Sequence, residues 1–203
     1  ADPANGSIQR LYAEDTNLII FQEDKVSRAL IDKDAIYSAE GNASITSSLQ
    51  VIGQIVAYAG EYGISTNPES FAVYGNRKYF TDKKRGVVLR LSGGVGGGQG
   101  ITEISSYGMH DFFRDELSSL STNKIVGSWD NHTKNYVISI QSASDYKTIS
   151  FDEDVLGWTT FLDFKPSYAF SLNNLYYTFN TGKMYQHHVG NYAKFYGITY
   201  GTS

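Results

Sequence analysis

Two adjacent histidines and a run of three acidic residues are the side chains whose types could support metal chemistry. His187 and His188 lie in a segment predicted to be a strand, so their side chains should point to opposite faces. Two ligands for one zinc ion on a strand would need i, i+2 spacing, which disfavours zinc here. Asp152-Glu153-Asp154 lacks the alternating oxygens and the distal Glu of a calcium-binding loop. We expect a solvated charged turn at residues 152–154 and no metal ligands.

A glycine-rich segment, residues 93–100, raises the question of phosphate binding. It begins with Gly93 and ends with Gly100. A phosphate-binding loop needs a Lys and a Ser or Thr directly after the glycines, at the start of a helix. Here Gln99-Gly100 leads into a predicted strand instead. The segment is therefore expected to be a flexible connection between strands, or an engineered linker that replaces a longer loop.

Motifs for nucleophilic or acid/base catalysis are missing from the sequence. It has no Gly-x-Ser-x-Gly elbow and no motif that nominates a pair of glycosidase carboxylates. Residues 110–116 carry four charges and an imidazole, but their spacing suits a solvated helix face. We expect no catalytic residue, no cofactor and no enzymatic activity. A propeller-type glycan-active enzyme stays open as an alternative, because paired acids can come from distant strands.

Aromatic side chains are the candidate ligand-contacting residues, because exposed rings can stack on sugars. The five candidates, which we expect to be exposed, are Trp129, Tyr176, Tyr177, Tyr192 and Tyr196. A tyrosine-rich β protein also uses such rings as cross-strand pairs. A carbohydrate-binding or receptor-binding module is therefore an alternative function, with a host-surface glycan as its partner.

The composition narrows the class of protein. The 203 residues include 16 Tyr and 11 Phe, which favour strands, and no Cys, which excludes disulfides and thiolate sites. The net charge of −4 is spread in mixed sign, which disfavours nucleic acid as a partner. No stretch approaches the ~20 apolar residues of a membrane span. Residues 1–7 are small and polar and are expected to be a vector-derived remnant, with residues 8–203 a single β-rich domain cut from a longer chain.

A repeated strand, polar turn, strand unit determines the expected fold. It occurs at residues 77–91, 127–140 and 168–188, with a looser copy at 17–31. Such repetition at roughly 40–50 residues predicts a mainly β protein with a propeller-like or meander arrangement of antiparallel hairpins. Other strands are expected at these residues: 35–38, 72–74, 101–104, 146–151, 158–164 and 193–199.

Two further segments depart from the strand pattern. Apolar residues recur with helical spacing at 107–120, which predicts one short packed helix. Residues 49–64 have neither helical nor strand period and are expected to be an irregular crossing. One member of each adjacent apolar pair should point outward. The expected core residues are Phe80, Val88, Leu89, Trp129, Val137, Ile138 and Phe161.

Three motifs in a fixed order carry a resemblance to a known family. They are the turn Asp82-Lys83-Lys84-Arg85-Gly86-Val87, the strand Ile101-Thr102-Glu103-Ile104-Ser105 and the helix Gly108-Met109-His110-Asp111-Phe112-Phe113-Arg114-Asp115. In this order they resemble the tail-nozzle, or muzzle, proteins of crAss-like short-tailed bacteriophages, over residues 15–140. The resemblance implies a structural component of the virion tail with a propeller-like domain, other virion proteins as partners and no known catalytic residue. Residues 93–100 depart from that family, which would have a shorter turn or a sizeable insertion there.

Overall fold

The computed structural model describes residues 2–14, 17–31, 52–93, 100–119, 121–189, 194–195 and 198–199. The strand expected at 35–38, the interior of the glycine-rich segment at 94–99 and two candidate aromatic residues, Tyr192 and Tyr196, lie outside these ranges. The described chain is mainly β, which confirms the predicted fold class.

Four antiparallel sheets follow one another along the chain, and each is a meander of consecutive strands. Sheet A contains β1 (Ile8–Glu14), β2 (Asn17–Gln22), β3 (Val26–Ile31) and β4 (Ile52–Ala57). Sheet B contains β5 (Ala72–Tyr74), β6 (Arg77–Asp82), β7 (Val87–Ser92) and β8 (Gly100–Glu103). Sheet C contains β9 (Lys124–Asp130), β10 (Asn135–Gln141), β11 (Tyr146–Asp152) and β12 (Gly157–Leu162). Sheet D contains β13 (Tyr168–Leu172), β14 (Leu175–Asn180) and β15 (Lys183–Gln186), and β16 (Lys194–Phe195) pairs with β17 (Ile198–Thr199).

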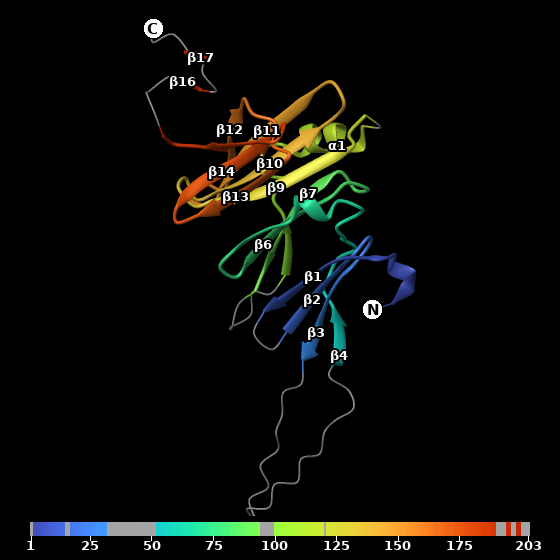
Figure 1. Cartoon of the computed structure of the whole chain (residues 1–203). Helices are drawn as coiled ribbons and strands as arrows, with labels where there is room; N and C mark the ends of the chain where they lie inside the picture. Colours follow the sequence, from blue (N-terminus) through green and yellow to red (C-terminus); the bar gives the residue numbers. More distant parts are fainter. Residues whose placement is uncertain are drawn as a thin grey trace, which may run out of the picture.

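The sheets pack face to face in chain order, with sheet B between sheets A and C (Figure 1). Phe21 of sheet A and Phe80 of sheet B are in ring contact, with centroids 5.2 Å apart, in the first interface. In the second interface, Trp129 and Tyr136 of sheet C stack on Tyr79 of sheet B. A smaller cluster of Val137, Phe164, Ala169 and Tyr176 joins sheets C and D.

Because the inner sheets are covered on both faces, adjacent residues are buried together. Val88 faces sheet C and Leu89 faces sheet A, and both are fully buried. Val137 and Ile138 are likewise both buried. The expectation that one member of each adjacent pair points outward is wrong for these strands. The prediction that Phe161 belongs to the core is also wrong. Phe161 is 59% exposed and lies on β12, an edge strand of sheet C.

The helix and one strand differ from their predicted bounds. The helix α1 spans His110–Ser118 rather than 107–120, because residues 105–108 form a turn that ends at Gly108 with a left-handed φ of +78°. Its Phe113 and Leu117 are buried against sheets B and C, as the helical spacing predicts. Residues 52–57, expected to be irregular, form β4, which pairs with β3.

Residues 2–7 pack against the turn between β2 and β3. They include the 3₁₀ turn η1 (Pro3–Asn5). The Gln22 side chain donates hydrogen bonds to the carbonyls of Asp2 and Gly6, and the Asp24 amide donates to the Asn5 carbonyl. Whatever the origin of this segment, its described residues are part of the folded structure.

Candidate functional site

The first strand of every sheet contributes to one groove. In each of the four sheets the first strand, β1, β5, β9 or β13, is an edge strand. The groove between them has a volume of about 340 Å³. The residues that line it come from sheet A, the 3₁₀ turn η2 (Pro68–Ser70), and sheets B, C and D. All four sheets therefore contribute to this hollow.

The polar residues of the groove come from positions far apart in the sequence. The Arg10 guanidinium lies 4.3 Å from the centre of the Phe71 ring and donates a hydrogen bond to the Pro68 carbonyl. Burial lowers the pKa of Arg10, while Tyr168 and Glu69 act in the opposite direction, which places both of them near its charge. Asn131 lines the groove directly after the end of β9, and its backbone amide donates a hydrogen bond to Ser171 Oγ of β13.

Trp129 lines this groove but is only 6% exposed, so the prediction that it belongs to the core is confirmed and the expectation that its ring is exposed for stacking is wrong. It lies between sheets B and C, with its ring stacked on Tyr74 at 4.3 Å and on Tyr79 at 5.4 Å. Both of its ring faces are therefore occupied by protein. The indole Nε1 is buried and has no hydrogen-bond partner among the described residues.

The two tyrosines of β14 that were predicted as ligand contacts lie on opposite faces of sheet D. Tyr176 is 1% exposed and its hydroxyl hydrogen-bonds to Ser128 Oγ of sheet C, so the prediction that it is exposed is wrong. Tyr177 is half-buried on the other face and stacks on Phe170, with centroids 5.5 Å apart. Together with Phe179 and Tyr168 these rings form a surface that we call the aromatic face of sheet D.

Three of the four histidines gather around one aspartate, which the sequence did not predict. Asp130 Oδ2 accepts a hydrogen bond from the Thr133 hydroxyl and lies 2.7 Å from His188 Nε2. The rings of His132 and His188 stack at 4.4 Å. His187 is buried and its Nε2 lies 2.8 Å from Thr178 Oγ1. Both His187 and His188 follow the end of β15, so the prediction that they lie within a strand is wrong.

This cluster joins the turn after β9 to the segment after β15. The positions His132 and His188 are too far apart in the sequence for any local motif to predict the contact. Within the ranges that the structure describes, no three or more His, Asp or Glu side chains, this cluster included, are placed so that they could hold one metal ion. The contacts instead suit a structural tie whose strength depends on pH.

His187 should make the folded state sensitive to acid. Burial lowers the pKa of His187 from its ordinary 6.5 to about 4, with a further contribution from His188 and an opposing one from Asp130. The unfolded chain therefore binds a proton at a higher pH than the folded chain. Stability is fully present above pH 6.5 and is lost as the pH falls to about 4, by about 3 kcal/mol at most.

Denaturant unfolding measured between pH 4.5 and 6.5 tests this expectation. The variant His187→Gln should show a flatter pH dependence over this window than the unmodified protein. The variant His110→Gln removes an imidazole that is 56% exposed and should keep the original slope. An equal slope in all three proteins would contradict the role given to His187.

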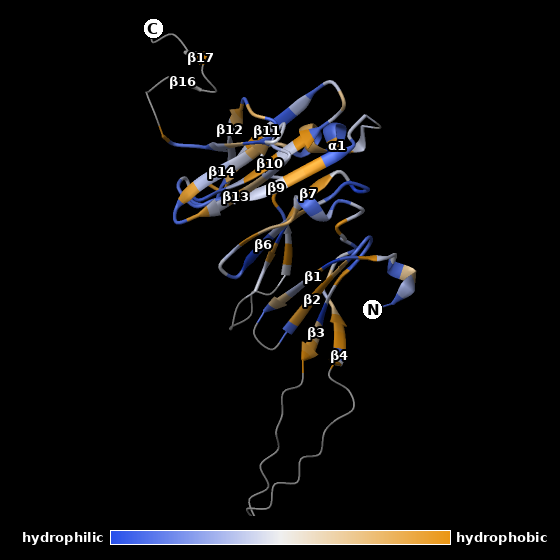
Figure 2. Ribbon diagram, viewed as in Figure 1, coloured by the Kyte–Doolittle hydropathy of each residue, from blue (hydrophilic) through white to orange (hydrophobic). Residues whose placement is uncertain are grey.

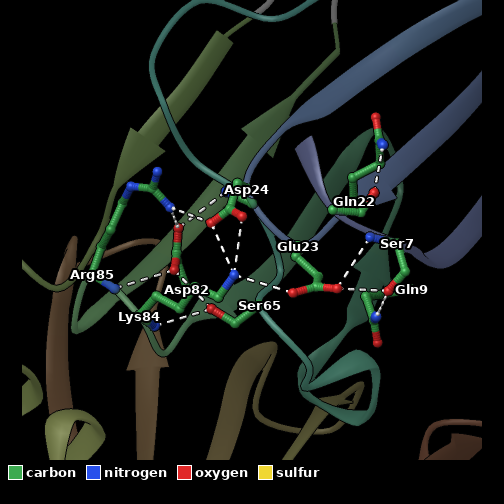
Figure 3. Close-up of polar contacts among 11 residues, drawn as sticks. Ser7, Gln9, Gln22, Glu23, Asp24, Ser65, Asp82, Lys84 and Arg85 are labelled. Atoms are coloured by element: carbon green, nitrogen blue, oxygen red, sulfur yellow. Dashed lines mark hydrogen bonds and ion pairs between the residues drawn. The ribbon is translucent and has the colours of Figure 1, made fainter. Parts of the chain in front are cut away.

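A second polar cluster joins sheets A and B (Figure 3). The fully buried Asp82 carboxylate accepts hydrogen bonds from the Gly63 amide, the Ser65 hydroxyl, and the Arg85 amide and guanidinium. Lys84 extends the cluster to sheet A by pairing with Glu23 and Asp24. Hydrogen bonds from Ser7 and then Lys84 lower the pKa of Glu23 to about 2. These carboxylates are occupied in holding two sheets together.

The acidic run at 152–154 forms a turn, as predicted, but it is not simply solvated. Asp152 Oδ1 accepts hydrogen bonds from the backbone amides of Asp154 and Val155. The Glu153 side chain is only 7% exposed and accepts from the Tyr79 hydroxyl and from Arg90, both of sheet B. Glu153 is therefore a tie between sheets B and C, because it pairs with a cation across the interface.

Comparison with known proteins does not assign this chain to a family. No family model matches the chain, and no curated protein matches it. Among the described helices, none has the length and apolar character needed to cross a bilayer.

Proposed function

We propose that this chain is a non-enzymatic structural domain of a bacteriophage tail, located in the virion and acting through contacts with other virion proteins. The observation that supports this proposal is that exposed apolar side chains lie on both end faces of the sheet stack. In proteins built from stacked repeats, the terminal repeats need a polar outer face if the protein is to stay soluble without a partner. A domain without such faces is suited to binding neighbours at its ends.

The first end face belongs to sheet A. On the face turned away from sheet B, Leu11 of β1 pairs with Ile20, and Ile55 of β4 pairs with Ala29. Ile20 and Ala29 are buried, so the exposed apolar residues are those of the two outer strands. Leu11 is 53% exposed and Ile55 is 40% exposed. Figure 2 shows the apolar character of β3 and β4 at this end of the molecule. β4 is an edge strand of sheet A, and all six of its residues are exposed. The unpaired backbone groups of such an edge strand are a template to which another chain can hydrogen-bond.

The second end face is the aromatic face of sheet D. Its residues alternate with Ala169 and Tyr176, which pack on sheet C, so this face points away from the stack. Tyr168 and Met184 are about 60% exposed. Aromatic residues and methionine are enriched at protein interfaces relative to the rest of a surface.

Buried charges support the proposal in a second way. Asp82, Glu153 and Lys78 are buried charged groups of the described structure that join successive sheets, Lys78 by an ion pair with Glu14 of sheet A. Each of these three charged groups forms an ion pair with another residue of the sheet stack. This use of charge fits a load-transmitting structural domain better than an acid/base site, where a titratable group must reach a substrate.

Substitutions on the two end faces test the proposal in the phage that encodes the chain. Leu11→Glu and Tyr177→Glu place a charge on one end face each, and Tyr146→Glu places one on β11, away from both. At least one end-face variant should reduce incorporation of the protein into virions tenfold or more, while the control is incorporated normally. Circular dichroism of the purified variants establishes that they fold. Normal incorporation of both folded end-face variants would contradict the proposal.

A further inference from the structure

We propose that the groove lined by β1, β5, β9 and β13 is a binding site for a neutral carbohydrate. In this site the Tyr168 ring stacks on a sugar, while Arg10, Glu69 and Asn131 hydrogen-bond to its hydroxyls. The inference does not rest on the phage-tail function, because it depends only on the groove and its lining.

The size and position of the groove are those of a ligand site. Its volume of about 340 Å³ falls within the range of roughly 300–1,000 Å³ that is typical of small-molecule sites. Edge strands of four different sheets carry most of the lining residues, while Glu69 lies in η2 and Asn131 lies in the turn after β9. Residues fixed in this way can present hydrogen-bonding groups without a large loss of entropy on binding.

The groove offers donors and acceptors that the protein does not use itself. The Arg10 guanidinium has five N–H donors, and one of its nitrogens donates to the Pro68 carbonyl. Other N–H groups of Arg10 can therefore donate to a ligand. Within the described ranges, the Glu69 carboxylate and the Asn131 side-chain amide make no hydrogen bond to another residue. A sugar hydroxyl both donates and accepts, so it suits this combination of a guanidinium, a carboxylate and an amide.

The charge of the groove favours a neutral ligand. Arg10 and Glu69 are its two charged residues, and they are of opposite sign. A strongly anionic ligand would meet the Glu69 carboxylate, and a cationic ligand would meet Arg10. A neutral sugar can hydrogen-bond to both without repulsion.

An exposed ring borders the polar lining. Tyr168 is 60% exposed, and its ring lies 6.1 Å from that of Phe170, which also lines the groove. An aromatic ring presents a flat apolar surface on which the C–H face of a sugar can stack. The nearby Trp129 carries an indole N–H without a partner in the described structure, and a buried unpaired donor costs about 1–3 kcal/mol. Because this nitrogen is itself buried, a ligand hydroxyl in the groove would reach it only after a local rearrangement of Trp129.

Binding of the whole 203-residue chain to an array of neutral, acidic and basic oligosaccharides tests the inference, with calorimetric titration of the best ligand. We expect a neutral oligosaccharide to bind. The variants Tyr168→Ala and Glu69→Gln should each weaken the binding tenfold or more. Glu69 is exposed and makes no hydrogen bond to another described residue, so we expect its variant to fold even if Tyr168→Ala does not. Tyr146→Ala removes an exposed tyrosine outside the groove and should bind as tightly as the unmodified chain.

The opposite outcomes overturn the inference. These are no binding of any neutral oligosaccharide, binding confined to charged glycans, or a neutral ligand whose affinity is unchanged in Glu69→Gln. Displacement of the bound sugar by unrelated peptides would show that the groove is a peptide site instead. None of these outcomes bears on incorporation of the chain into virions, so the two proposals fail separately.

Discussion

Gly127→Ala is expected to destabilise the protein by about 3 kcal/mol or more, because no space exists for a methyl group at this position. A Cβ on Gly127 would lie 1.9 Å from the Ser70 carbonyl oxygen and 2.5 Å from its carbon. Both atoms belong to the backbone of η2, so no side-chain rotation can relieve the clash. Sheets B and C would have to separate, which would also break the hydrogen bond from the Tyr136 hydroxyl to the Ser70 carbonyl. Urea unfolding of the purified variant measures the loss.

Gly157→Ala is the matched control for this substitution. A Cβ on Gly157 would have no atom within 4 Å, and Gly157 lies at the start of β12 without a left-handed φ. Its urea midpoint should equal or exceed that of the unmodified protein. Equal stability of the Gly127 and Gly157 variants would show that sheets B and C are not packed as closely as described.

Asp82→Ala is expected to destabilise the protein by about 3 kcal/mol or more. Removal of one partner from a buried, hydrogen-bonded ion pair typically costs about 3–5 kcal/mol. Loss of the carboxylate leaves the Gly63 amide and the Ser65 hydroxyl without their acceptor. It also removes the buried partner of Arg85. Because these groups join the loop after β4 to the turn between β6 and β7, sheets A and B should become less stable together.

Hydrogen exchange and urea unfolding distinguish this effect from a general effect of removing a carboxylate. Asp115→Ala removes a carboxylate that is 67% exposed and pairs with Arg114 on the helix surface. Surface pairs contribute little to stability, so this variant should keep the original urea midpoint. If Asp82→Ala also kept it, the cluster in Figure 3 would not hold the sheets together.

Most of the strands could be predicted because their local chemistry agrees with the fold. The β13–β14 turn, for example, has Asn173 and Asn174 at φ of 49° and 61°, the left-handed values that asparagine tolerates and tight hairpins require. The repeated hairpins similarly predicted the meander of each sheet. Local turn preferences and strand patterns depend on neighbouring residues alone, so a single sequence contains them.

The errors come from packing between sheets, which no local pattern contains. The run at Ile52–Ala57 is exposed along its whole length, so it lacks the alternation by which a half-buried strand is predicted. Trp129 was predicted both as a core residue and as an exposed ring, and the structure decides for the core because rings of sheet B enclose it. Phe161 was expected in the core but lies on an edge strand. In each case the deciding contact, or its absence, involves residues distant in the sequence.

The candidate site could not be predicted for the same reason. Arg10, Glu69, Asn131 and Tyr168 belong to separate segments of the chain, and only the stacking of four sheets brings them to one groove. Tyr177 is the candidate aromatic that the structure places on a half-exposed face. The residue types alone did not separate such rings from the buried ones.

The proposed function predicts that this chain is encoded by a phage, and its most direct test is quantitative mass spectrometry of virions purified from cells whose phage carries the coding sequence. The proposal predicts peptides from across residues 8–203 in virions purified by density gradient, in a constant ratio to the other tail proteins from one preparation to the next. Peptides present in the infected-cell lysate but absent from the purified virions would contradict it.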